Sequence, residues 1–298
     1  MRFSVCSLVF SLSFLTVSAQ PETIIELKTS PDYRLFITNK LYQAEWQIRI
    51  PEVIDAREGT FLTSVRPSVT WRTFPDGSVG YDWSGQTNYA AEVRKAAGDR
   101  IQIVTGLTIS PRIKVNSNCV KMELTLKNIS TQPLHDICAD GGCLAHRTER
   151  FFDDHFTNSF IFTVAGLTSL SNTDRSAGIR AKYFFHPAWF ESRTTKAYEF
   201  FWGRSTTRPA EALIVSGARE GKGAIGVAWD NCLGLRQNSD SSHRCMHSSP
   251  YFGDLKPGEA ATRRGVIIFG DTVPEVVATF RGRSFRVYER PPADTSGD

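Results

Sequence analysis

The segment between residues 223 and 269 carries the side chains best suited to chemistry. Asp230 and Asn231 follow an apolar run, and Asn238 and His247 come after them. A carboxylate, two amides and an imidazole offer the paired donors and acceptors that bind sugar hydroxyls. We therefore predict that these four side chains line a pocket, in which His247 is the best candidate for a general acid or base near neutral pH.

Two apolar runs, Ala224–Trp229 and Arg264–Phe269, flank this segment and predict buried strands. Asp230 leaves the first run at its end, where polar groups can line the mouth of a site. The residues between the runs are interpreted as a long, functional loop. Trp229 is predicted to be a stacking platform for a sugar ring, and a core position is the alternative.

A resemblance to known proteins begins in the same segment. Residues 245–259 read CMHSSPYFGDLKPGE, and they end in a Pro-Gly-Glu turn that enters the last core strand. This turn resembles that of galactose mutarotase-like β-supersandwich proteins. The longer pattern Cys-x-His-Ser-x-Pro followed by Pro-Gly-Glu is similar to that of secreted bacterial proteins without an assigned function. The resemblance extends more loosely from Leu35 to Tyr288.

The resemblance implies a fold and a carbohydrate context. In mutarotases a glutamate in a Cys-Leu-Glu-like position acts as the base, and the comparable place here reads Cys245-Met246-His247. The resemblance thus implies an alternative function as a sugar epimerase or a polysaccharide lyase that uses His247 as its acid or base.

The first 19 residues have the form of a cleaved secretory signal. Arg2 precedes a short apolar stretch that ends in Val-Ser-Ala before Gln20. We expect a secreted or periplasmic protein with one β-sandwich domain at residues 20–290 and a disordered tail at residues 291–298. No later segment is apolar enough to span a membrane.

Charge and composition limit the partners. The formal net charge is +4 over 298 residues, and the lysines and arginines form no dense tract. Nucleic acid is therefore not an expected partner. A carbohydrate or glycan is the expected partner, and the sequence leaves the oligomeric state open.

The hydrophobic pattern predicts an all-β fold, a large antiparallel β-sandwich with few short helices. Val120–Asn128 alternates apolar and polar residues over its whole length and should bury one face. Other expected strands are Arg34–Ile37, Ala44–Ile50, Ser68–Thr73 and Ile101–Ser110. Helical periodicity appears at Tyr89–Ala97 and Val273–Arg281.

Cleavage of the signal leaves five cysteines, which an exported protein tends to pair. We predict disulfides between Cys138 and Cys143 and between Cys232 and Cys245, with Cys119 buried and free. The second bridge would fold the chain back and bring residue 247 near residue 230.

Two groups of residues could instead hold a metal. On a strand, His243, Cys245 and His247 would share one face, and Cys138, Cys143 and His146 form a second set. Zinc or copper would suit these ligands, but export favours disulfides. We therefore predict no metal and no cofactor.

Polar residues after residue 145 are further candidates for ligand binding. His146 and Arg150 open a stretch of charged and aromatic residues that could grip sugar hydroxyls, and a solvated loop with internal ion pairs is the alternative. The chain has no Gly-x-Ser-x-Gly, His-Glu-x-x-His or P-loop motif. The first prediction is thus an exported carbohydrate-binding or envelope-associated β-sandwich, and whether it is also an enzyme stays open.

Overall fold

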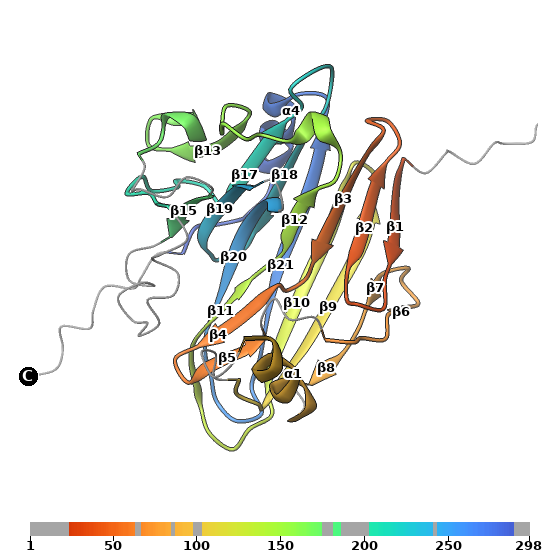
Figure 1. Ribbon diagram of the computed structural model, residues 1–298, viewed down its shortest axis with the longest axis vertical. Coiled ribbons are helices and arrows are strands. Elements are labelled where there is room, and N and C mark those ends of the chain that lie inside the picture. The colour runs from red at the N-terminus through yellow and green to blue at the C-terminus, as the bar shows by residue number, and fades with distance from the viewer. Residues whose placement is uncertain are drawn as a thin grey trace, which may run out of the picture.

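The computed structural model of the chain describes residues 24–62, 67–84, 87–97, 103–174, 181–185, 203–240 and 243–288. The predicted signal peptide and the predicted tail lie outside these ranges. The described residues form two large sheets packed face to face (Figure 1). Pairing is antiparallel except between two short strands, so the prediction of an all-β sandwich with few short helices is confirmed.

The first sheet has eleven strands. Its main path runs β1 (Ile25–Thr29), β2 (Leu35–Asn39), β3 (Ala44–Arg49), β12 (Cys143–His146), β20 (His243–Leu255), β11 (Leu134–Asp140), β4 (Val53–Ala56) and β5 (Gly59–Leu62). Three further strands extend it from β20, namely β19 (Cys232–Asp240), β15 (Ala181–Phe185) and β16 (Gly203–Arg204).

The second sheet has ten strands. Its path runs β14 (Gly166–Ser169), β13 (Ser159–Thr163), β17 (Leu213–Gly217), β18 (Ala224–Trp229), β21 (Ala260–Gly270), β10 (Cys119–Asn128), β9 (Leu107–Asn116), β7 (Val79–Gly80) and β6 (Arg72–Thr73), with β8 (Trp83–Ser84) beside β9.

The strand β10 shows why the chain folds into layers. Its even-numbered residues from Val120 to Asn128 are buried, whereas Lys121, Glu123 and Lys127 are exposed, as the alternation predicts. Its neighbours β9 and β21 pair with it along nearly its whole length. Two other expected strands are only partly present. Of Ser68–Thr73, only Arg72–Thr73 is in a strand, and of the described residues of Ile101–Ser110, only residues 107–110 are.

The helices are short. In the described ranges they are α1 (Thr87–Ala97), α4 (Val273–Arg281) and the 3-10 turns η2 (Glu149–Phe151) and η3 (Leu170–Asn172). Both α-helices lie where the periodicity predicts them. Val276 and Phe280 of α4 are buried, and the helix covers β17, β18 and β21 on the outer face of the ten-stranded sheet. No helix in the described ranges is long and apolar enough to cross a membrane.

The segment between β18 and β21 differs from the prediction. Instead of a loop, it forms the long hairpin of β19 and β20, and its strands belong to the opposite sheet. The predicted turn after Leu255 is present: Glu259 N–H donates to the Lys256 carbonyl, and Gly258 has a φ of +80° that favours glycine.

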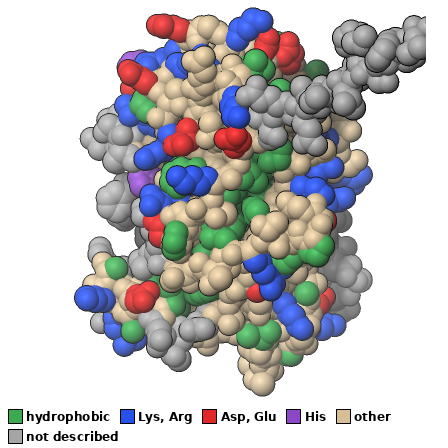
Figure 2. Space-filling model, turned by 90° about the vertical axis from the view of Figure 1, so that its right-hand side faces the viewer, with side chains coloured by type: hydrophobic (Ala, Val, Ile, Leu, Met, Phe, Trp, Pro, Cys, Tyr) green, Lys and Arg blue, Asp and Glu red, His purple; other side chains and the backbone are tan. Residues whose placement is uncertain are grey.

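The edge of the sandwich on the right of Figure 1 faces the viewer in Figure 2. Lysine and arginine side chains are interspersed with aspartates and glutamates over this face, and apolar surface lies between them. Charges of one sign do not gather here into a continuous patch.

Candidate functional site

A row of side chains crosses the eleven-stranded sheet. Tyr183 of β15 pairs with Arg236 of β19, which pairs with His247 of β20. The antiparallel register of β12 and β20, continued by one residue, places Cys143 beside His247. Cys143 in turn pairs with Arg49 of β3. Directly paired residues of antiparallel strands project on the same face. Five strands therefore bring these five side chains together.

This row occupies the face turned away from the ten-stranded sheet. The sequence neighbours of the row point the other way and belong to the hydrophobic core between the sheets: Ile48, Leu144, Phe184, Leu235 and Met246. Since side chains alternate along a strand, the row lies on the outer face. It is nevertheless buried, and the His247 side chain has no exposed surface.

Two carboxylates complete the row. Arg236 Nη2 donates to Asp140 Oδ2 at 2.5 Å and to Glu52 Oε2 at 3.2 Å, while its Nη1 donates to the Tyr183 hydroxyl at 2.9 Å. Arg49 Nη1 donates to Glu52 Oε1 at 2.9 Å. Glu52 follows the end of β3 and Asp140 ends β11, so the ends of two strands aim their carboxylates at one arginine. We call the row with these two carboxylates the buried polar cluster.

The charges of the buried polar cluster depend on one another. Burial and Arg236 both lower the pKa of His247, but Asp140, whose Oδ1 is 2.8 Å from Nδ1, outweighs them and raises it to about 9. Burial would raise the pKa of Asp140, but Arg236 and His247 lower it below its usual value. At neutral pH the cations of Arg236 and protonated His247 thus face the ionised carboxylate of Asp140.

Two thiols adjoin the histidine. Cys245 Sγ lies 3.0 Å from His247 Nε2, and Asn238 Nδ2 donates to the same sulfur at 3.2 Å. The ligand atoms of Cys143, Cys245 and His247 all lie within 4.8 Å of one another. Contact with Cys245, together with burial, raises the pKa of the Cys143 thiol well above its ordinary value. The ring of His247 forms a second such group with Asp140 and Glu52.

The predicted disulfides are wrong. No disulfide joins the five described cysteines, namely Cys119, Cys138, Cys143, Cys232 and Cys245. The register of the hairpin explains one error, because Cys232 pairs with Pro250 and Cys245 with Asn238, at opposite ends of the two strands. The second error has a similar cause. Cys138 pairs with β4 and β20, whereas Cys143 pairs with Arg49 of β3.

The predicted pocket is divided between the two sheets. His247 and Asn238 lie in or beside the buried polar cluster, but Trp229 is buried between the sheets and offers no platform. Asn231 has a φ of 54°, and its Nδ2 donates to the Tyr251 carbonyl at 2.8 Å, so it supports a turn. Asp230 lines a pocket on the outer face of the ten-stranded sheet. The predicted disulfide between Cys232 and Cys245, which would have brought these residues together, is absent, so they lie apart.

The two candidates near residue 150, His146 and Arg150, both contact other parts of the protein. His146 is buried, and its Nδ1 accepts a hydrogen bond from Trp46 Nε1 at 3.2 Å. Burial lowers the pKa of His146 to about 4, so the ring is neutral. Arg150 donates to the Tyr42 carbonyl and lies over the ring of Phe151. Neither side chain reaches the buried polar cluster through a contact described here.

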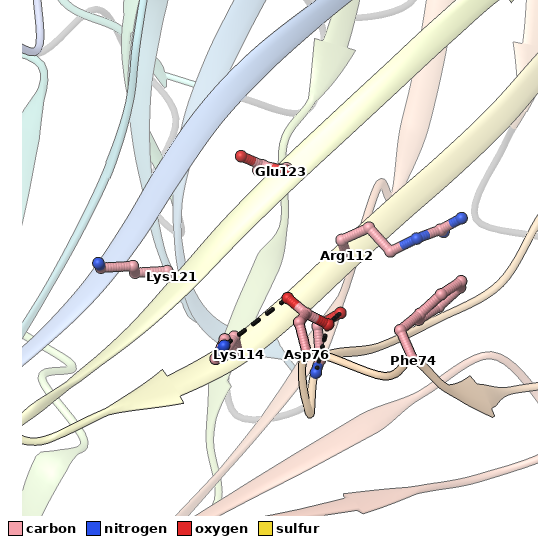
Figure 3. Close-up of a pocket in the computed structure, with 7 residues that line it drawn as sticks. Phe74, Asp76, Arg112, Lys114, Lys121 and Glu123 are labelled. Carbon is pink, nitrogen blue, oxygen red and sulfur yellow. Dashed lines mark hydrogen bonds and ion pairs between the residues drawn. The ribbon is translucent and has the colours of Figure 1, made fainter.

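An open pocket lies on the outer face of the ten-stranded sheet (Figure 3). Its volume is about 310 Å³, and Lys121 and Glu123 of β10 project toward it from one side. Arg112 of β9 lies over the ring of Phe74, 3.8 Å from its centre. Asp76 accepts from Ser78 and is 3.7 Å from Lys114 Nζ, and the hydrogen bonds from Ser78 lower the pKa of its carboxyl.

A second pocket, of about 410 Å³, shares Lys121 and Glu123 with the first. Its other polar lining includes Asp230, Arg264 and Arg283, and Phe285 lies beyond α4. The two pockets thus adjoin at these two residues, and we call them together the outer groove. Five cationic and three acidic side chains line it, an excess of two positive charges.

The residues that reasoning from sequence missed are mostly charged. They include Arg49, Glu52, Asp140 and Arg236 in the buried polar cluster and the lysines of the outer groove. A signal for Arg236 was present, since it is a charged residue inside the run Cys-Leu-Gly-Leu-Arg-Gln. Interpreting that run as a strand would have placed Arg236 and His247 on opposite strands of one hairpin.

Comparisons with known proteins identify the fold. No family model matches the sequence, and no curated protein matches it either. Among solved structures, a galactose mutarotase-like protein from Lactobacillus casei ATCC 334 has a TM-score of 0.51 at 9% identity, over 84% of this chain and 98% of that one. The chain therefore has a galactose mutarotase-like fold, as the sequence resemblance predicts.

Two other solved structures are also similar. The GalNAc complex of the alpha-N-acetylgalactosaminidase NagBb from Bifidobacterium bifidum has a TM-score of 0.50 at 11% identity, over 88% of this chain but only 38% of that protein. A putative aldose 1-epimerase from Escherichia coli K12 has a TM-score of 0.41 at 8% identity, over 83% of this chain and 99% of that one. At such identities the likeness concerns the fold.

Proposed function

We propose that this protein is an exported or envelope-associated carbohydrate-binding protein, and that the outer groove binds a glycan bearing carboxylate groups. The observation that carries the proposal is the lining of the outer groove, where cationic and acidic side chains surround the ring of Phe74. The fold supports a carbohydrate context, because similar structures include a galactose mutarotase-like protein and a glycosidase in complex with GalNAc.

The chemistry of the outer groove suits an acidic sugar. Carboxylates such as Glu123 and Asp230 accept hydrogen bonds from sugar hydroxyls, and Lys114 and Lys121 can donate to a uronate. The excess of two positive charges favours an anionic ligand over a neutral one. Together the two pockets have the volume of a ligand site that accepts more than one sugar ring.

Burial favours binding over an acid–base reaction at His247. The His247 side chain has no exposed surface, and both ring nitrogens already have partners, Nδ1 in Asp140 and Nε2 in Cys245. A general acid or base must come within hydrogen-bond distance of the proton that it transfers. The epimerase or lyase alternative would require the side chains around His247 to move apart.

We expect Lys121→Ala to weaken binding of a uronate oligosaccharide by roughly 10- to 150-fold, because a hydrogen bond to a charged group contributes about 1.5–3 kcal/mol. Lys127→Ala is the matched control: both lysines are exposed on the same face of β10, but Lys127 lines neither pocket. A glycan screen of the intact protein would identify the ligand. Titration calorimetry at low and high salt would then compare the variants, and binding should weaken as salt rises.

Three results would contradict the proposal. One is a screen in which the wild type binds no acidic glycan. Another is a glycan that binds equally well to wild type and Lys121→Ala. Epimerised or cleaved products in the same mixtures, lost in His247→Ala but retained in Lys121→Ala, would support the enzyme alternative instead.

A further inference from the structure

We propose that Cys143 and His247 of the buried polar cluster, together with the adjoining Cys245, form a binding site for one zinc ion. This site is separate from the outer groove and does not depend on the proposed glycan binding. Thiolate and imidazole are the ligands that zinc prefers in proteins. Adjacent strands, β12 and β20, supply all three side chains from one face of the sheet.

The distances fit a metal ion. The three ligand atoms lie within 4.8 Å of one another, and Cys245 Sγ is 3.0 Å from His247 Nε2. With Zn–S near 2.3 Å and Zn–N near 2.0 Å, tetrahedral coordination separates sulfur from nitrogen by about 3.5 Å. A zinc ion therefore requires these two atoms to separate by only about half an ångström.

A disulfide between the same two cysteines fits less well. Cys245 pairs directly with Ala145, so Cys143 is its diagonal neighbour on the adjacent strand. Diagonal neighbours have Cα atoms about 7–8 Å apart. The Cα atoms of a disulfide are usually about 4.4–6.8 Å apart. The sulfurs can thus converge on a common ion more readily than they can form a bond.

Asp140 orients the imidazole ring of His247 in the way that carboxylates orient zinc-binding histidines. Asp140 Oδ1 lies 2.8 Å from His247 Nδ1, and Nε2 lies 3.0 Å from Cys245 Sγ. Arg236 Nη2 is also 2.8 Å from Nε2, so the guanidinium has to turn away from that nitrogen when the metal binds. A carboxylate on the far nitrogen of a zinc-bound histidine is the usual arrangement, since it fixes the orientation of the ring. Asn238 can supply the fourth ligand. Its Oδ1 is buried without a hydrogen-bond partner, and rotating the amide exchanges that oxygen with Nδ2, 3.2 Å from Cys245 Sγ.

The charges balance with a divalent ion. Zinc with two thiolates and a neutral imidazole carries no net charge. The remaining members, Arg49 and Arg236 against Glu52 and Asp140, also sum to zero. A monovalent ion such as Cu⁺ would leave one negative charge buried, which is costly. The site should therefore select zinc over a monovalent soft ion.

Metal titration of the full-length protein tests the proposal. After chelator treatment under reducing conditions, the wild type should take up one equivalent of zinc. Co²⁺ in its place should give a thiolate-to-metal charge-transfer absorption. We expect Cys143→Ser and Cys245→Ser to weaken zinc binding more than about 100-fold, beyond the 10–100-fold typical of outer-shell changes. Cys119→Ser is the matched control, a buried cysteine on the other sheet.

The cobalt spectrum of the wild type tests the proposed zinc site even if a variant fails to fold. Absence of the charge-transfer band, or zinc uptake that Cys143→Ser and Cys245→Ser leave unchanged in folded protein, would overturn the proposal. Peptide mapping that finds Cys143 and Cys245 joined in a disulfide after purification without reductant, and no metal uptake after reduction, would overturn it as well.

Discussion

Replacing Trp229 by alanine should lower the free energy of unfolding by about 3–5 kcal/mol, the cost of emptying a large buried aromatic site. Trp229 has no exposed surface and lies between the two sheets. A Cβ added to Gly265, its partner on β21, would come within 2.7 Å of the indole ring, so the ring packs directly on that glycine. Urea unfolding followed by circular dichroism measures the loss.

A double substitution makes the test sharper. Gly265→Ala should be destabilising in the wild type, because the methyl group overlaps the indole, but should cost little beside Trp229→Ala. Trp229→Phe should cost less than Trp229→Ala, since it fills part of the site and removes an indole N–H that has no hydrogen-bond partner. Trp83, half-buried on β8, is the control. A loss below about 1 kcal/mol in Trp229→Ala would contradict the packing described.

Lowering the pH from 6.5 to 4 should remove about 2.5 kcal/mol of stability through His146 alone. Burial lowers the pKa of His146 from 6.5 to about 4. Between these values the unfolded chain binds a proton that the folded protein does not, so the unfolded state gains stability as the pH falls. Protonation of Nδ1 would also place a second donor against the indole N–H of Trp46.

The variant His146→Gln isolates this contribution. Glutamine offers Trp46 an acceptor oxygen but does not titrate in this range. The difference in unfolding free energy between wild type and variant should therefore narrow as the pH falls from 6.5 to 4. Chemical denaturation at half-unit pH intervals measures it. Parallel stability curves for the two proteins would contradict the assignment of a neutral, buried His146.

Local patterns in the sequence were sufficient to predict the layered β-sandwich. Alternation in β10 and helical periodicity at α1 and α4 are properties of consecutive residues, and the structure agrees with them. The β19–β20 hairpin was missed because its strands mix cysteines, histidines and serines with apolar residues. Cys245 and His247 lie at the buried polar cluster, whereas Ser248 accepts a hydrogen bond from the Trp229 N–H on the opposite face. Because both faces of the hairpin are buried, the usual apolar–polar signal of a half-exposed strand is absent there.

The candidate sites were harder to predict, because their residues come from distant parts of the chain. Glu52, Asp140 and Arg236 meet only through the pairing of five strands, and no short motif contains two of them. His247 could be selected as a candidate site residue from its residue type alone. The spacing of Cys232 and Cys245 suggested a bridge, and the register that prevents it is a property of the hairpin as a whole.

The position of the last two strands determines when the protein can fold. β21 lies between β10 and β18 in the interior of one sheet, and β20 pairs with β11, β12 and β19 in the other. A growing polypeptide that has not reached residue 270 therefore lacks an interior strand in one or both sheets. Neither sheet can close during most of synthesis on the ribosome, and the nascent chain stays open. An unfolded precursor is the form that a Sec-type leader, predicted at residues 1–19, needs for passage through the translocon.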